Sequence, residues 1–506
     1  MLAWTIYISF LGALALLLMP KAGARAVRPI ALLTAMAGFA IAVIAVCRYT
    51  PGEVLTVTRV PWIPSLGIEY HLAADGISLT LLLLTGIVAI AGVLFSWNVD
   101  RRPTEFFALY LLLIGAVYGV FLSFDLFLFF VFYELAIIPK YFLIAIWGST
   151  RREYAAMKLA LYSFAGSAMV LIGLIAAFVE AGGKTMNLME LARFPFPAHF
   201  QMWVFPLVFV GFAILAGLWP FHTWAPTGHV AAPTAASMLL AGVVMKLGAY
   251  GCLRVAMMIF PGGLEPWGFH VLGFGSWREV FALLALIGIV YGASVALVQK
   301  DFKFVIGYSS VSHMGFVLLG LMTLNQIGLS GAVLQMYSHG VIAGLLFAVA
   351  GRMVYDRTHT RDLSELGPMH LARLIPFAAV TFAIACMASI GLPGFSGFVA
   401  EFEILIGAWR AFPTLAMVAG AGILIGIAFT WRALDKAFFG DGSITGSAAR
   451  PAAAECPRIS LAERMGAAIL IAATLAVGVY PRLLLDLIIP ALNSPLFDGL
   501  RKGVWR

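Results

Sequence analysis

The stretch 126–147 reads LFLFFVFYELAIIPKYFLIAIW, and the stretch 234–255 reads TAASMLLAGVVMKLGAYGCLRV. Each is mostly apolar and has about the twenty residues that an α-helix needs to cross a bilayer. Glu134 lies in the first stretch and Lys246 in the second. A charge near the bilayer centre costs at least about 2.5 kcal/mol, so such residues usually face a polar interior and carry ions or protons. The two stretches therefore predict transmembrane helices that line a buried proton path.

The composition supports the same class. Hydrophobic residues make up 62% of the 506 positions and charged residues only 11%, which leaves too little polar surface for a water-soluble globule of this size. With about twenty residues per crossing, the chain has room for about fourteen helices. We expect an all-α, multi-pass membrane protein with one membrane domain over 1–506. The expected helices are 2–19, 28–47, 77–97, 105–123, 126–147, 158–180, 202–219, 231–255, 279–299, 303–323, 328–351, 374–408 (broken), 412–434 and 463–485.

The formal net charge of +8 is distributed unevenly. If about fourteen spans are right, most basic residues between spans fall on one face of the membrane. The positive-inside rule places that face in the cytoplasm and both chain termini on the outer face. The opposing loops, such as 50–75, are poor in Lys and Arg. The basic residues on the predicted cytoplasmic face are Lys21, Arg25, Arg28, Arg101, Arg102, Arg151, Arg152, Lys158, Lys300, Lys303, Arg352, Arg357, Arg361 and Arg373.

Two spans in corresponding halves of the chain are interrupted by Pro and Gly. The first interruption, GLWPFHTWAPTGHVAAPT at 217–234, holds Pro220 and His222, and the second, SIGLPGFSGFVAEFE at 389–403, holds Pro393 and Gly394. Broken helices in matching positions indicate a transporter built from inverted repeats, because freed backbone groups can line a hydrated path. The alternative is that Pro and Gly, which are common in membrane helices, only kink packed ones. Two breaks in register favour the functional interpretation.

Glu134 and Lys246 are the first candidate proton-transfer residues. Burial disfavours a charge and a nearby opposite charge restores it, so either side chain can change protonation as its partner moves. A fixed structural ion pair is the alternative for Glu134. Snorkelling to the membrane surface is the alternative for Lys246, but its position in the middle of the span argues against that.

Two histidines and one more glutamate complete the candidates. His313 (SSVSHMG) and His339 (QMYSHG) lie among hydroxyl residues, and an imidazole can relay a proton between its two nitrogens near neutral pH. A hydrogen-bonded core histidine is the alternative. Glu401 and Glu403 follow the second break and point about 160–200° apart on a helix. We expect Glu401 to face the interior.

No redox framework accompanies these residues. The sequence has no G-x-x-x-x-G-K-[ST] motif, no dinucleotide-binding glycine pattern and no cysteine cluster that would hold iron and sulfur. We therefore expect no redox cofactor and no metal site in this chain.

Five motifs resemble those of a known family, the antiporter-like subunits of proton-pumping NADH:quinone oxidoreductase (respiratory complex I), and among them subunit M (chain 4). The resemblance covers most of the chain and is highly specific for this superfamily. The motifs are WIPSLGIEYHLAADGISL at 62–79, FYELAIIPKYFLIAIWG at 132–148, PFHTWAPTGHVAAPTAASMLLAGVVMKLGAYG at 220–251, DFKFVIGYSSVSHMGFVLLG at 301–320 and GLPGFSGFVAEFEIL at 391–405.

The resemblance implies fourteen helices with two inverted five-helix repeats, at about 105–255 and 279–434, and a C-terminal helix at about 463–485. The motifs match three residues to the family's pattern: Glu134 to its helix 5 glutamate, Lys246 to its central helix 8 lysine and Glu401 to its helix 12 acidic residue. It implies a bacterial inner-membrane subunit beside L- and N-type subunits, in which quinone reduction elsewhere drives proton movement. NADH, FMN, iron-sulfur clusters and quinone would be bound by partner subunits.

One feature departs from the family pattern. The family usually places a lysine a few residues before the Pro-x-His-x-Trp break, to pair with the glutamate that Glu134 matches, but Leu215 occupies that position here. Lys140 stands where an apolar residue is expected. It is a candidate substitute partner for Glu134, although six residues separate them by about 120° around a regular helix. Only a kink at Pro139 or a bent side chain would bring the two charges together.

Three other interpretations share many of these features. One is a subunit of a multi-subunit cation/proton antiporter. Another is the equivalent subunit of a membrane-bound hydrogenase or a ferredoxin-linked complex. The third is a membrane scaffold that no longer pumps, which the presence of Leu215 favours and the presence of Glu134, Lys246 and Glu401 opposes.

Overall fold

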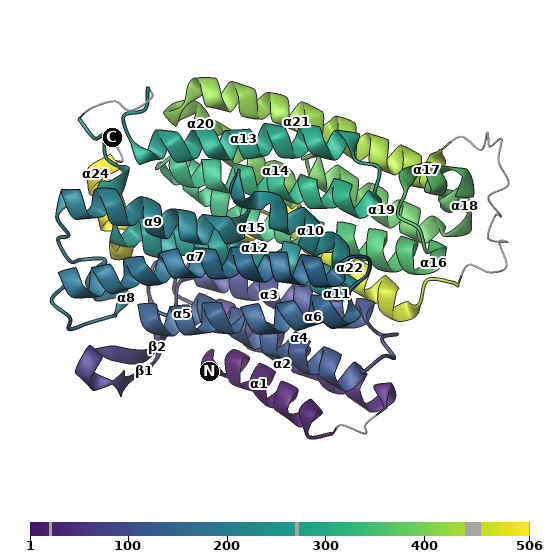
Figure 1. Ribbon diagram of the computed structural model, residues 1–506, viewed down its shortest axis with the longest axis horizontal. Coiled ribbons are helices and arrows are strands. Elements are labelled where there is room, and N and C mark those ends of the chain that lie inside the picture. The colour runs from purple at the N-terminus through teal and green to yellow at the C-terminus, as the bar shows by residue number, and fades with distance from the viewer. Residues whose placement is uncertain (20–22, 269–272, 441–456, 505–506) are drawn as a thin grey trace.

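The computed structural model describes the chain except for residues 20–22, 269–272, 441–456 and 505–506. Most of the long helices run side by side along one direction (Figure 1). The β-hairpin, α8 and α24 gather at one end of this bundle, and α16, α17 and α18 gather at the other end. Among the described residues, twelve helices are long and apolar enough to cross a membrane, or thirteen if a bent C-terminal pair is counted as one span. The expected multi-pass helical membrane fold is therefore confirmed.

The first half of the chain holds the hairpin and seven of the twelve candidate spans. Its helices and strands are α1 (Ala3–Leu17), α2 (Ala24–Cys47), β1 (Leu55–Ile63), β2 (Ile68–Ala74), α3 (Gly76–Phe95), α4 (Pro103–Leu122), α5 (Leu126–Leu135), α6 (Ile137–Trp147), α7 (Arg152–Glu180), α8 (Leu188–Leu191), α9 (Ala198–Ala216), α10 (Trp224–Ala231), α11 (Thr234–Leu239) and α12 (Met245–Gly251).

The second half holds the other five candidate spans. Its helices are α13 (Trp277–Val298), α14 (Phe302–Met322), α15 (Gln326–Phe347), α16 (Asp356–Thr358), α17 (Leu363–Leu366), α18 (Leu371–Leu374), α19 (Pro376–Ser389), α20 (Ser396–Ala411), α21 (Pro413–Leu434), α22 (Leu461–Val479), α23 (Arg482–Leu492) and α24 (Asp498–Val504).

The expected count of fourteen spans stays a prediction. The twelve long spans leave out α1, which has 15 residues, and α19, which has 14 and is followed by the break before α20. Both helices are apolar, and adding them to the twelve gives fourteen segments near the positions expected from the sequence. The broken span is the fourth of five in each half, α9–α10 in 103–257 and α19–α20 in 277–439. The inverted relation of these halves also stays a prediction.

The structure corrects two expectations at the ends of the bundle. The segment 50–75, expected as a loop, forms the antiparallel hairpin of β1 and β2, which turns at Gly67 with a left-handed φ of 59°. The C-terminal helix, expected over 463–485, ends at Val479, and Pro481 precedes a separate helix, α23. Proline cannot donate a backbone hydrogen bond, which favours a helix end at this point.

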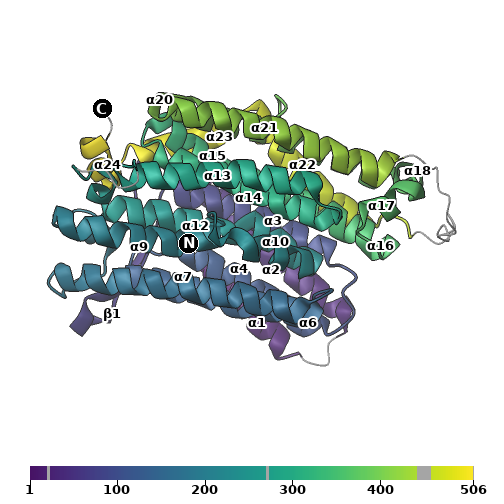
Figure 2. The same ribbon diagram turned by 45° about the horizontal axis from the view of Figure 1, so that its top comes forward.

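Two spans form the centre of the bundle. The apolar windows of Thr234–Met257 and Gln326–Thr358 are completely buried, whereas only 28% of the window in Pro413–Phe439 is buried. Figure 2 shows α21 on the outside of the bundle and α12 and α14 inside it. The buried spans carry Lys246 and His339, so both side chains lie where lipid cannot reach them.

Candidate functional site

Lys246 lies on a short α-helix between two π-helical segments. Its helix, α12, is flanked by π-helical segments at Leu240–Val244 and Cys252–Met257. Such segments are rare and frequently occur at functional sites. The Lys246 side chain is fully buried; its Nζ donates a hydrogen bond to the Ala241 carbonyl and lies 2.8 Å from His339 Nδ1. The structure therefore brings together two residues that are 93 positions apart.

The row of polar side chains continues from His339 to Glu401. The rings of His339 and His313 have centroids 5.5 Å apart, and His313 Nδ1 lies 2.6 Å from Glu401 Oε1. A cavity of about 10 Å³ is lined by both histidines and by Glu401, and this is close to the least space that a water molecule needs, about 10–15 Å³. Gln335 also donates to Glu401 Oε1 at 2.8 Å. These four residues, Lys246, His339, His313 and Glu401, are here called the central row. They form two hydrogen-bonded contacts, Lys246 with His339 and His313 with Glu401, whose imidazole rings are neighbours, while His313 Nε2 contacts Ser389 Oγ at 3.1 Å.

The two glutamates after the second break have different surroundings. Glu401 is 5% exposed and faces the central row. Glu403 is partly exposed and accepts a hydrogen bond from Ser330 Oγ at 2.9 Å. The break lies beside Glu401, because a Cβ added at Gly391 would come 3.8 Å from Glu401 Oε2. Glu401 is thus the glutamate that faces the interior, as expected, while its role in proton transfer stays a prediction.

A kink brings Glu134 and Lys140 toward the same neighbouring helix. Pro139 clashes with the carbonyl four residues before it, at Leu135. Accordingly, α5 ends at Leu135 and α6 begins at Ile137. Lys140 is only 1% exposed and donates to Ser163 Oγ on α7 at 3.2 Å.

Glu134 and Lys140 approach α7 on either side of this kink without a direct contact between their charged groups. Ser167 on α7 lies beside the Glu134 carboxylate, whereas the Lys140 ammonium bonds to Ser163. Ser163 and Ser167 stand one helical turn apart, and the Ser167 hydroxyl donates to the Ser163 carbonyl at 2.7 Å. Together these four side chains form what we call the α7 cluster. Leu215, at the position of the missing lysine, is a buried apolar residue of α9.

The broken helices contain the remaining candidates. In the first break Pro220 is exposed at the surface, whereas His222 is buried with its ring 5.2 Å from that of Tyr291. In the second break Gly394 has a φ of +98°, a conformation that residues with a side chain rarely adopt. Pro393 directly precedes it in the segment between α19 and α20. These residues shape the breaks and are not bonded to the central row by any contact of the described residues.

Sequence reasoning missed a buried ion pair on the helix of Lys246. Arg254 Nη2 donates to both Asp75 oxygens at 2.6 and 2.7 Å, and Arg254 Nε donates to Tyr250 Oη at 3.2 Å. Both charged side chains are at most 1% exposed. The arginine stands eight residues after Lys246, and the paired Asp75 had been assigned to a surface loop. The pair fixes the end of this span against the start of α3, where Asp75 also accepts from Ser78 N.

A second missed residue is His229 on α10. It is fully buried and interacts electrostatically with Lys246 and Lys303. It follows His222 by seven residues, which is about two turns of a regular helix, although His222 itself lies in the short 3-10 turn Phe221–Thr223 before α10. That spacing was a signal in the sequence for a second interior histidine.

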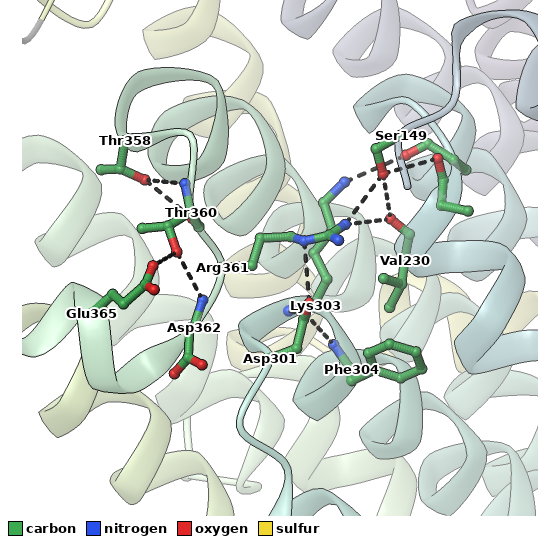
Figure 3. A network of polar contacts seen from close by, with 12 residues as sticks. Ser149, Val230, Asp301, Lys303, Phe304, Thr358, Thr360, Arg361, Asp362 and Glu365 are labelled. Carbon is green, nitrogen blue, oxygen red and sulfur yellow. Dashed lines mark hydrogen bonds and ion pairs between the residues drawn. The ribbon is translucent and has the colours of Figure 1, made fainter. Parts of the chain in front are cut away.

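At the end of the bundle with the basic loops, a polar network fixes the ends of several helices (Figure 3). Arg361 forms an ion pair with Asp301 at 3.2 Å and donates to the Val230 carbonyl at 2.9 Å. Lys303, buried beside it, donates weakly to the Ala232 carbonyl at 3.4 Å. Asp301 and Lys303, at the start of α14, therefore anchor α14 and α10 at this end and do not contact the central row.

The fold and the central row define a class of protein: a multi-pass membrane protein with broken helices and a row of ionisable side chains in its interior. The sequence profile described as NADH:quinone oxidoreductase/Mrp antiporter, TM, matches residues 123–427. The chain belongs to this family, and the resemblance found in its motifs is confirmed.

Three comparisons illustrate the relation. NADH-quinone oxidoreductase subunit M of Rhodobacter capsulatus is 37% identical over 443 residues, covering 85% of this chain and 82% of that protein. A chain of respiratory complex I from Thermus thermophilus with bound NADH superposes with a TM-score of 0.87 at 28% identity, over 99% of this chain and 100% of that chain. A chain of the Mrp complex from Dietzia superposes with a TM-score of 0.84 at 23% identity, over 99% of each chain, which shows a shared fold.

Proposed function

We propose that this chain is a proton-translocating membrane-arm subunit of an NADH:quinone oxidoreductase. The central row carries the proposal, because four ionisable side chains from four helices connect there in the buried core. Charged groups buried in membrane spans usually mark ion or proton pathways. Its relatives named subunit M or chain 4 support the parent complex.

In this proposal the proton moves along the row by changes of partner. Lys246 and His339 share one hydrogen-bonding contact, and His313 and Glu401 share another. An imidazole can receive a proton on one nitrogen and release one from the other, and a water molecule in the small cavity that both histidines line would join the two contacts. Quinone reduction in other subunits would shift the charges that decide where the proton rests. NADH, FMN, the iron-sulfur clusters and quinone would be bound by those partners.

The α7 cluster would form the other end of the path within this chain. Lys140 takes the role of the missing family lysine, because it is the buried amine whose charge interacts with that of Glu134. Leu215 cannot supply a positive charge. Movement of Lys140 toward or away from Glu134 would control whether the carboxylate is ionised.

The placement of the chain in the membrane belongs to the same proposal. The basic loops would face the cytoplasm by the positive-inside rule, with both termini on the outer face of a bacterial inner membrane. The α16–α18 end of Figure 1 would then be cytoplasmic. L- and N-type subunits of the parent complex would be its neighbours.

Replacing Lys246 with Ala tests the proposal directly. The change removes the amine from a fully buried position and leaves no new buried charge. We expect the complex to assemble, and proton pumping per NADH oxidised to fall strongly in inverted membrane vesicles. Glu134→Gln, which keeps the size and loses the charge, should act similarly. Assembled K246A complex that pumps at the normal ratio would contradict the role of the central row.

The shared fold with an Mrp complex keeps a cation/proton antiporter as the second candidate. Purification of the native complex in mild detergent separates the two. Co-purifying flavin and iron-sulfur subunits support the oxidoreductase, and their consistent absence from an intact, active complex supports the antiporter.

A further inference from the structure

An apolar groove lies between α1, α4 and α6, on a face that the central row does not use. Its volume is about 480 Å³, within the range of about 300–1,000 Å³ that is typical of small-molecule sites. Helix α1 lies at the lower edge of the molecule in both views, and Figure 2 shows α6 beside it at that edge (Figures 1 and 2). The apolar residues along the groove include Leu14, Leu17, Leu109, Leu112, Phe142 and Ile146.

The depth of the groove matches one leaflet of a bilayer. Its lining begins at Arg102, directly before α4, and extends along that helix to Leu112. Ten residues of α-helix rise about 15 Å, which is half of the ~30 Å hydrocarbon core of a membrane. The groove therefore spans the length of one lipid acyl chain.

Charged groups stand at one end of the groove only. Arg102 forms an ion pair with Glu105, and its guanidinium lies 5.9 Å from the centre of the Trp147 ring. The two charged side chains are 53% and 43% exposed, so both remain accessible to a ligand. Tryptophan is enriched at the level of lipid headgroups, and an arginine guanidinium binds phosphate oxygens well. This end thus has the chemistry of a headgroup site.

We propose that the groove binds one phospholipid of the leaflet on the basic-loop side, with an acyl chain along α4, its phosphate on Arg102 and its ammonium on Glu105. Glu105 disfavours a headgroup with net negative charge and favours one that carries an amine, as in phosphatidylethanolamine. The groove is apolar along α4 and charged at one end only, which is the polarity of a phospholipid, and binding of a partner helix instead is an outcome that the experiment below detects.

Photocrosslinking tests the site in the intact purified complex. The probe is phosphatidylethanolamine with a photoactivatable group on its acyl chain, and crosslinked peptides are identified by mass spectrometry. We expect crosslinks to concentrate on peptides of α1, α4 and α6. Leu14→Trp fills the groove and should reduce them severalfold. Leu11→Trp is the matched control, because Leu11 lies on the same helix, is 54% exposed against 51% for Leu14, and does not line the groove.

The headgroup contacts have their own test. Arg102→Gln should weaken crosslinking up to about fivefold, as expected for the loss of one partly exposed ion pair. Glu105→Gln should remove the preference for phosphatidylethanolamine over phosphatidylglycerol. Leu11 and Leu14 are both half-exposed, so the two tryptophan variants described above should assemble. Leu17→Trp is a second variant that fills the groove.

Two results would overturn the proposal. One is equal crosslinking in the Leu14 and Leu11 variants, and the other is crosslinking of groove residues to a helix of another subunit. Equal capture of phosphatidylethanolamine and phosphatidylglycerol by the unchanged protein would overturn the headgroup assignment. None of these results depends on pumping, so they test the groove independently of the proposed function.

Discussion

Replacing Lys140 with Met tests whether this chain has moved the partner of Glu134 to a new position. Methionine has a similar length and no charge, so the packing around the 1% exposed side chain is largely kept. Removing one partner of a direct buried ion pair typically costs ~3–5 kcal/mol. Lys140 bonds to Ser163 and does not touch Glu134, and Glu134 is only partly buried. We therefore take about 1.4 kcal/mol, which disfavours the ionised form of Glu134 roughly tenfold.

The expected result is a fall of up to about tenfold in proton transfer through this chain, measured as fewer protons pumped per NADH oxidised, since transfer through the α7 cluster needs an ionised Glu134. The assay compares dye quenching by acidification of inverted vesicles with the NADH oxidation rate in the same sample. Lys184→Met is the matched control, because Lys184 is an exposed lysine in the loop after α7. It should leave the ratio unchanged.

A normal pumping ratio in the Lys140→Met complex would refute the reasoning. The double variant with Leu215→Lys supplies an amine at the position that the family usually fills. Restored pumping in the double variant would show that the missing charge, and not a change in packing, caused the loss.

Three further results follow from the geometry. Glu401→Gln should lower proton pumping at least about tenfold, and Glu403→Gln should lower it less than about twofold, because only Glu401 belongs to the central row. Equal losses in the two variants would contradict the assignment. Arg254→Met should lower the thermal unfolding midpoint of the purified complex by leaving Asp75 unpaired at a cost of ~3–5 kcal/mol, and adding Asp75→Asn should restore part of it; an unchanged midpoint would show that the pair is not stabilising. Burial raises the pKa of Asp125, just before the α5 span, to about 6, although backbone N–H groups oppose the shift. The folded protein therefore holds the Asp125 proton more tightly than the unfolded chain does. The contribution of this group to stability is full below about pH 4 and is lost as the pH rises through about 6. Asp125→Asn should reduce the difference in unfolding midpoint between pH 4.5 and pH 7.

Much of the fold could be predicted from the sequence because a bilayer imposes few solutions on the chain. A span needs about twenty apolar residues and must satisfy its backbone polar groups internally. The runs around Glu134 and Lys246 meet that rule, and the interruptions at Pro220 and Pro393 are visible as departures from it. The hairpin was missed because its strands lie outside the apolar spans, where this rule says nothing.

The tertiary structure alone decided which charges meet. Lys246 contacts His339 across 93 residues, and Arg254 pairs with Asp75 across 179 residues. Helical periodicity relates residues three or four positions apart and carries no information on such separations. Lys140 illustrates the same limit: a regular helix would point it away from Glu134, and only the break before Pro139, with α7 packed alongside, brings both charges to Ser163 and Ser167. The sequence by itself determined that charges lie within the membrane, whereas packing between helices determined their partners, because contact between distant segments depends on how the spans assemble.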